Sequence, residues 1–265
     1  MEAAMYALGR GSEGYATVAA SELLMVRQHP EHPSELATLA GARLVVCSEL
    51  EDGQRFAEAR VKQLTGRDSI PARFMRADWF SFTPSHTLWL VGNHRPEART
   101  GGPAFWRRVR MVPFTRVVAP ERQDRRLGER LAADAAVILA WIIRGAVAYH
   151  RDGLADPPAV RAATAAYARD EDTVGRFVEE QCRLDSGCPP VRVATTAFRE
   201  AYERWCAEAG ERPVSAKRLT QELRERFGVL DTRGAKGKRF YNGICLVDEP
   251  AGHGSSAAPA VEAAP

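Results

Sequence analysis

Short apolar runs alternate with polar, helix-like stretches over the first 118 residues of the chain. The runs RLVVCS (43–48), FSF (80–82), TLWLVG (87–92) and RMVPF (110–114) are bounded by glycine, proline or acidic residues. Runs of this length with such boundaries predict β-strands. The pattern therefore predicts an α/β core, parallel or mixed, from residue 1 to about residue 118.

The hydrophobic period changes between about residues 119 and 183. Apolar side chains recur at three- and four-residue spacing in LGERLAADAAVILAWIIRGAVAYHRDG (127–153) and in PAVRAATAAYARDEDTVGRFVEEQC (158–182). This spacing is typical of helices, and Gly153 is a helix stop signal. We expect a helical region here.

A turn-rich break, DSGCPP (185–190), separates the helical region from the last folded segment. Two helix patterns (195–210 and 215–228) precede a glycine-punctuated basic hairpin (231–247). Together they predict a winged-helix module over residues 184–248, whose second helix can lie in a major groove while the hairpin contacts phosphate. The tail at 249–265 is rich in Ala, Pro, Gly and Ser, which predicts disorder.

The net charge hides a local basic cluster. The formal charge of +3 is the difference between 37 basic and 34 acidic residues, so a nucleic-acid surface has to be local. Between residues 215 and 240, eight basic residues stand against three acids. The eight are Lys217, Arg218, Arg224, Arg226, Arg233, Lys236, Lys238 and Arg239. The cluster favours DNA binding, although many winged helices mediate protein contacts instead.

Cysteine, histidine and tryptophan usage narrows the class of protein. Five cysteines without CxxC spacing and six histidines without metal-ligand spacing indicate reduced thiols and no metal cluster. No apolar run approaches the ~20 residues of a membrane span, and no signal-peptide pattern begins the chain, so we expect a soluble, unexported protein. The five tryptophans lie in apolar patterns and are predicted to be mostly core: Trp79, Trp89, Trp106, Trp141 and Trp205.

Polar side chains follow two of the predicted strands. Glu49 and Glu51 come directly after RLVVCS, and Asn93 follows TLWLVG. Carboxylates at the carboxyl edge of a parallel sheet can hold Mg²⁺ and polarise a water for attack on a γ-phosphate. If the two strands are adjacent, the Asn93 amide can orient that water. Taken alone, acids after a strand are also ordinary turn chemistry.

Two further groups of basic residues carry candidate chemistry. Arg107 and Arg108 directly precede RMVPF, where a guanidinium could reach a phosphate on a neighbouring subunit. In the segment 61–85, Arg73, Phe74 and Arg76 alternate charge and aromatic character around an expected hairpin, which suits a single-stranded backbone. The alternatives are a solvated basic turn for the arginine pair and a core position for Phe74.

Four sequence blocks, in their order along the chain, resemble the second half of the superfamily 3 helicase domain of phage and plasmid primase-helicases, which are AAA+ ATPases. The blocks are RLVVCSELEDG, KQLTGRDSIPARFMR, TLWLVGNHRP and FWRRVRMVPF. The resemblance spans roughly residues 1–245. It implies a hexameric ring that unwinds DNA with ATP and Mg²⁺, contacts single-stranded and duplex DNA, and works in the cytoplasm of a bacterial host of a phage or plasmid.

The resemblance also implies roles for particular residues. It implies a Walker B acid at Glu49, which meets Mg²⁺ through the nucleotide, with Glu51 as second candidate. It implies a sensor-type asparagine at Asn93 and an arginine finger at Arg108, with Arg107 as the alternative. The block 62–76 resembles the DNA-contacting hairpin of the family, which adds Lys62 to Arg73, Phe74 and Arg76. In the C-terminal module the expected DNA contacts are Lys217, Arg218, Lys236, Lys238 and Arg239.

One departure from the family pattern is large. The family carries a P-loop, GxxxxGK[ST], upstream of the segment that resembles residues 1–25, and no GK[ST] occurs in these 265 residues. The glycines of GRGSEG (9–14) have no lysine to meet phosphates and predict a loop. We therefore expect a fragment, a shortened reading frame or a degenerate relic. Two functions stay open: a segment of an ATP-driven helicase, and a DNA-binding or assembly module without turnover.

Overall fold

The computed structural model describes residues 1–11, 14–27, 33–48, 50–98, 101–185, 191–234 and 237–247. The chain divides into two compact units, Met1–Glu171 and Asp172–Pro265. The boundaries expected from the sequence, near residues 118, 183 and 248, stay predictions.

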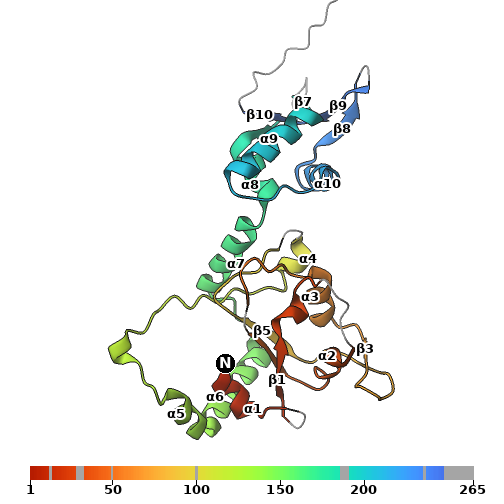
Figure 1. Cartoon of the computed structure of the whole chain (residues 1–265). Coiled ribbons are helices and arrows are strands. Elements are labelled where there is room, and N and C mark those ends of the chain that lie inside the picture. The colour runs from red at the N-terminus through yellow and green to blue at the C-terminus, as the bar shows by residue number, and fades with distance from the viewer. Residues whose placement is uncertain are drawn as a thin grey trace, which may run out of the picture. The chain divides into compact units, whose positions relative to one another are not determined.

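A three-stranded parallel sheet forms the centre of the first unit (Figure 1). Its order is β1 (Ala16–Ala20), β2 (Leu44–Ser48) and β5 (Thr87–Val91), with Val46 of β2 opposite Val18 and Trp89. The strands predicted at 43–48 and 87–92 are confirmed. The described chain is thus a mixed α/β protein with a parallel sheet.

Alternation along β2 explains how the sheet is covered. Val45 and Cys47 point into the main core, whereas Leu44 and Val46 pack against Met5. Because successive strand residues point to opposite faces, a fully apolar β2 can be covered on both sides. The described helices of the first unit are α1 (Glu2–Leu8), η1 (Ser21–Leu24), α2 (Pro33–Ala37), α3 (Glu58–Leu64), α4 (Pro103–Trp106), η2 (Pro120–Arg122), α5 (Leu127–Ala133), α6 (Ala135–Asp152) and α7 (Pro158–Asp170).

An antiparallel hairpin projects from the main core. Strand β3 (Ile70–Ala72) pairs with β4 (Phe80–Phe82), which confirms the predicted strand at 80–82 and the hairpin expected around it. Ile70 and Ala72 are fully buried, so the base of the hairpin is anchored.

The strand predicted at 110–114 is wrong. Residues 109–119 have no helix or strand in the structure, and the Phe114 side chain is 90% exposed. An apolar run becomes a strand only when another strand accepts its hydrogen bonds. Within the described chain, β5 pairs with β2 alone, and the backbone N–H of Met111 donates to the hydroxyl of Thr164 at 2.9 Å.

The predicted helical region is present but broken. The run 127–153 forms α5 and α6, which separate at Asp134, and α6 lies beside α1 (Figure 1). Among the described residues no single helix is long and apolar enough to cross a membrane. The segments Pro120–Ala133 and Ala135–Asp152, bent by 75° at their junction, meet the length and composition test only as a pair.

Several tryptophans depart from the core positions predicted for them. Trp205 is buried and Trp106 packs against the main core, but Trp79, Trp89 and Trp141 are exposed. Trp89 lies on a sheet face that α1 covers only in part, and Trp141 lies on α6, which buries no residue. An apolar pattern does not say whether the chain supplies a cover for each face, which is why the prediction failed there.

The second unit has its own core of aromatic side chains. Phe177 lies within 5.2–5.8 Å of the rings of Phe198, Tyr202 and Trp205. Its elements are α8 (Thr173–Gln181), β6 (Cys182–Leu184), β7 (Arg192–Ala194), α9 (Thr195–Glu208), α10 (Ala216–Phe227), β8 (Leu230–Arg233), β9 (Arg239–Asn242) and β10 (Ile244–Leu246). Strands β7, β9 and β8 form an antiparallel sheet in that order, and β10 pairs with β6. The two helices and the hairpin expected from the sequence are present.

Candidate functional site

The carboxyl ends of β2 and β5 meet at one edge of the parallel sheet. Ser48 pairs with Val91, so the residues that follow both strands leave the sheet together. Gly92 allows the close approach, because a Cβ there would lie 2.8 Å from Cδ1 of Leu50. The strand adjacency on which the predicted role of Asn93 depends is therefore present.

Glu51 and Asn93 are both exposed in the segments that leave this edge. Their carboxylate and amide oxygens are the hard donors that Mg²⁺ prefers. Glu49 lies outside the described residues. The catalytic roles of Glu49, Glu51 and Asn93 stay predictions.

Backbone hydrogen bonds join the loops at this edge. The N–H of Glu97 donates to the carbonyl of Gln54 at 2.8 Å, and the N–H of Phe56 donates to the carbonyl of Glu97 at 2.9 Å. The His94 ring also lies 3.6 Å from the carboxylate of Asp52, both side chains being well exposed. The loop after β5 is thus held against the loop after β2.

Helix α7 holds the same loop from its other side. The Tyr167 hydroxyl donates to the carbonyl of Pro96, and the Glu171 carboxylate accepts the N–H of Ala98 at 2.6 Å. Burial, and then the charge of Glu171, raises the pKa of Tyr167, so this hydroxyl keeps its proton at neutral pH. Arg95 adds an ion pair with Asp170 at 3.1 Å. Asn93 therefore begins a loop whose backbone is fixed on two sides.

Arg107 and Arg108 follow the short helix α4, which packs against the core through Phe105. Phe105 is fully buried and lies 5.4 Å from the Phe56 ring, while Arg108 donates to the carbonyl of Ala104. Arg107 is exposed, and among the described residues neither arginine forms an ion pair. No described contact links them to Asn93. A role in a neighbouring subunit stays a prediction.

The hairpin presents the basic and aromatic residues that the sequence singled out. The Arg73 guanidinium lies 5.0 Å from the centroid of the Trp79 ring, and Phe74 stacks on Phe80 at 5.8 Å. Arg76 has a positive φ of 59° in the turn. Lys62 lies on α3, half-buried. Sequence reasoning placed Trp79 in the core, although its position between Asp78 and β4 was a signal for the hairpin.

A hollow of about 560 Å³ opens between the loop after β1 and the start of α3. Glu22, Arg27, Arg60 and Gln63 line it together with apolar side chains. Burial, and then the charge of Arg27, lowers the pKa of Arg60. None of the predicted site residues that the structure describes lines this hollow, so the nucleotide site is not assigned to it.

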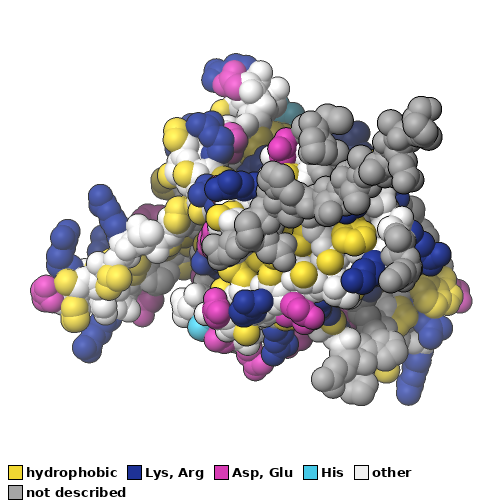
Figure 2. Space-filling model, turned by 90° about the horizontal axis from the view of Figure 1, so that it is seen from above, with side chains coloured by type: hydrophobic (Ala, Val, Ile, Leu, Met, Phe, Trp, Pro, Cys, Tyr) yellow, Lys and Arg dark blue, Asp and Glu magenta, His cyan; other side chains and the backbone are white. Residues whose placement is uncertain are grey.

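Charges of both signs are intermingled on the surface, as Figure 2 shows for one face. In the second unit, ion pairs with acids lower the number of free positive charges in the basic cluster. Arg218 pairs with Glu222 at 2.7 Å, and Arg239 pairs with Asp231. Arg226 pairs with Asp172 and with Glu222. Three of the eight basic residues are therefore committed to acids of the same unit.

The basic residues that pair with no described acid include two of the five predicted DNA contacts, and the roles of all five stay predictions. Lys217 and Arg224 are exposed on α10, seven residues apart and so on one face of the helix, and no described acid pairs with them. Arg233 and Lys238 are exposed at the ends of the β8–β9 hairpin. The sequence predicted Lys217 and Lys238 as DNA contacts but omitted Arg224 and Arg233. Lys236 lies outside the described residues.

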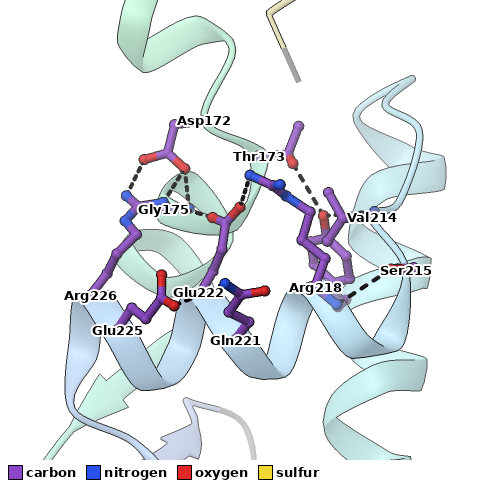
Figure 3. A network of polar contacts seen from close by, with 11 residues as sticks. Asp172, Thr173, Gly175, Val214, Ser215, Arg218, Gln221, Glu222, Glu225 and Arg226 are labelled. Atoms are coloured by element: carbon purple, nitrogen blue, oxygen red, sulfur yellow. Dashed lines mark hydrogen bonds and ion pairs between the residues drawn. The ribbon is translucent and has the colours of Figure 1, made fainter. Parts of the chain in front are cut away.

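A polar network joins α8 to α10 (Figure 3). Asp172 caps α8 by accepting the N–H of Gly175 at 2.9 Å, and it accepts from Arg226 at 2.7 Å. Burial alone would raise the pKa of Asp172, but the hydrogen bonds and the charges of Arg226 and Arg176 outweigh it and lower that pKa. Ser215 caps α10 through the N–H of Arg218. The network fixes the helix that carries Lys217 and Arg224.

Comparisons with known proteins find a curated relative and a number of solved structures. The chain is 30% identical over 189 residues to "Putative helicase 022R" of Frog virus 3 (isolate Goorha), a match that covers 63% of this chain and 19% of that protein. The chain thus spans about a fifth of the length of this relative. No family model matches the chain.

One of the solved structures similar to this chain is the apo structure of the NrS-1 C-terminal region (305–718). It is 7% identical, with a TM-score of 0.36 over 88% of this chain and 61% of that chain.

Proposed function

We propose that this chain is a segment of an ATP-dependent DNA helicase that acts in DNA replication. The observation that carries the proposal is the 30% identity over 189 residues to the viral protein named "Putative helicase 022R". The meeting of β2 and β5 supports it, because that edge of the sheet receives both Glu51 and Asn93. The activity of the whole protein is part of the proposal, since the chain spans about a fifth of that relative.

In this proposal the residues at the sheet edge divide the chemistry. Glu49, or Glu51, accepts a proton from the attacking water, and the Asn93 amide orients that water. When bound with the nucleotide, Mg²⁺ neutralises charge on the phosphoryl group. No GK[ST] occurs in these 265 residues, so a loop that cradles the phosphates has to come from a further segment.

Assembly belongs to the same proposal. Arg108, or Arg107, stabilises phosphoryl charge in the site of a neighbouring copy within a ring. The fixed helix turn that Phe105 anchors suits such a role, because a positioned guanidinium loses little entropy on binding.

DNA is the proposed partner of both units. In the second unit, α9 and α10 followed by the β8–β9 hairpin support assignment of a winged helix, with α10 and the hairpin facing duplex DNA. In the first unit, the β3–β4 hairpin contacts a single strand through Arg73, Phe74 and Arg76.

A second candidate function is a DNA-binding or assembly module without ATP turnover. The separate core and the uncommitted basic residues of the second unit favour it, because they require no nucleotide. If this surface does not bind DNA in a direct measurement, that result would favour protein contact as its role.

ATP turnover distinguishes the two candidates. We expect background turnover from the 265-residue chain and DNA-stimulated turnover from a longer chain that adds an in-frame GxxxxGK[ST] segment. In that longer chain Glu49→Gln should stop hydrolysis yet permit ATP binding. Mixing it with the Arg107→Ala, Arg108→Ala double variant should restore part of the activity, because a mixed interface pairs an intact acid with an intact arginine. Full turnover by the 265-residue chain would contradict the proposal, and DNA binding without turnover by the longer chain would favour the second candidate.

A further inference from the structure

The tip of the β3–β4 hairpin carries large apolar side chains in solvent. Phe74 is 49% exposed, Met75 is 73% exposed and Trp79 is 58% exposed. The strands beneath them are fixed, because Phe80 and Phe82 pack against the main core. A rigid base with exposed aromatic rings at its tip is typical of a binding surface.

The two aromatic rings of the tip are in different surroundings. Phe74 stacks on Phe80 with the ring planes 22° apart, so one of its faces is occupied by a ring that belongs to the core. Among the described residues Trp79 has no aromatic partner, and the Arg73 guanidinium lies 5.0 Å from its ring centroid. A guanidinium over one face of an indole holds the ring in place through a cation–π interaction and leaves the other face available.

The charges around the ring favour an anionic backbone. Arg73 and Arg76 lie within the tip, and Asp78 directly precedes Trp79. Arg76 adopts the left-handed region with φ 59°, which is uncommon outside glycine and recurs at ligand clamps. Because Asp78 repels phosphate beside the ring, the phosphate contact falls to Arg76.

We propose that Trp79 is the base-stacking residue of this hairpin for single-stranded DNA. Arg73 positions the indole, and Arg76 contacts the phosphate backbone. A single strand is the fitting partner because its base faces are open, whereas in a duplex they are covered by neighbouring base pairs. The inference rests on the proposed function, since it names the residue that meets the strand at the hairpin.

The experiment compares two probes with the 265-residue chain. One is a labelled thymidine oligonucleotide, and the other has the same length and backbone but abasic sites in place of the bases. We expect Trp79→Ala to weaken binding of the thymidine probe about five- to 150-fold, from the ~1–3 kcal/mol that stacking contributes, and to leave binding of the abasic probe unchanged. Arg76→Ala should weaken both. Trp79→Phe should restore part of the thymidine affinity, because a phenyl ring keeps a stacking face.

The matched control is Trp141→Ala, which removes another exposed tryptophan of the same unit and should change neither affinity. Melting curves of each variant distinguish a missing stacking interaction from a failure to fold, and Phe74→Ala should lower the melting temperature more than Trp79→Ala does. Unchanged thymidine affinity in Trp79→Ala, or equal loss on both probes, overturns the inference. If Trp79→Ala changes the oligomeric state of the chain but not its affinity for either probe, the inference is overturned as well. Failure of the unaltered chain to bind either probe would overturn the DNA-binding part of the proposed function as well.

Discussion

His86 is a half-buried titratable residue outside the candidate site, and both of its ring nitrogens are buried. Among the described residues, neither of its ring nitrogens has a hydrogen-bond partner of normal geometry. Burial lowers its pKa, and the nearby backbone of Leu39 and Leu64 opposes this only in part. The neutral ring is therefore the form that the folded chain prefers.

The pH dependence of stability follows from that preference. Because the folded pKa is below the unfolded value of about 6.5, the unfolded chain binds more protons in the window between the two values. The free energy of unfolding should therefore decrease as the pH falls from about 6.5 towards the folded pKa. We expect His86→Leu to remove this slope in urea unfolding curves, and His150→Leu, at an exposed position on α6, to retain it. An unchanged slope in His86→Leu would show that another group titrates.

Asp172 combines a helix cap with an ion pair, so its removal should loosen the second unit. We expect Asp172→Ala to lower the local free energy of unfolding of α8 and α10 by about 1–3 kcal/mol. Amide hydrogen exchange can measure this for each helix. Since the folded pKa of Asp172 is lowered, its contribution is present above the unfolded value of about 3.9 and is lost as the pH falls below it.

The control for this prediction is Asp152→Ala. Asp152 pairs with Arg151 at 2.7 Å, with both side chains more than half exposed, and such pairs contribute little. Its effect should stay within about 0.5 kcal/mol. Similar effects from both substitutions would contradict the role assigned to the cap.

At the scale of elements, the junction of β2 and β5 depends on Gly92. A Cβ at this position would lie 2.8 Å from Cδ1 and 3.0 Å from Cβ of Leu50. We expect Gly92→Ala to destabilise the first unit by about 1–3 kcal/mol, because the two loops have to separate. Thermal unfolding measures the change. Gly128→Ala, in α5 with no described atom within 4 Å of its added methyl group, should be neutral or stabilising, and the contrast fails if both variants melt alike.

The sequence predicted those elements whose signal is local. Strands β2 and β5 were predicted because a long apolar run and its boundaries lie within a few residues. The segment 110–114 has the same local signal, but it lacks the partner on which a strand depends. The base of the hairpin was predictable for the same reason as β5, whereas the exposure of Trp79 depends on how far the tip stands from the core. Periodicity does not encode that distance.

At the scale of the molecule, the basic residues counted in the C-terminal module are not all free, because some of them form ion pairs with acids of the same unit. The pair of Arg218 with Glu222 is visible in the sequence as a four-residue spacing on one helix. The pair of Arg226 with Asp172 joins residues 54 positions apart and required the fold. Charge counting therefore overestimates the free cations of a folded unit, and the proposed DNA-binding surface consists of the cations that pair with no described acid.

The salt dependence of duplex binding tests that definition. If α10 and the hairpin contact phosphates, the logarithm of the affinity should fall linearly with the logarithm of salt concentration. We expect the Lys217→Ala, Arg224→Ala double variant to flatten the slope by about 0.9 for each phosphate that is no longer neutralised, and Lys238→Ala to act in the same way. Arg218→Ala removes one basic residue as well, but its charge is already committed to Glu222, so the slope should change little. Anisotropy titrations at several salt concentrations, with a melting curve for each variant, give the comparison. If Arg218→Ala flattens the slope as much as removal of Lys217 and Arg224 does, the ion pairs do not decide which cations bind DNA; if no variant changes it, duplex DNA does not bind this surface.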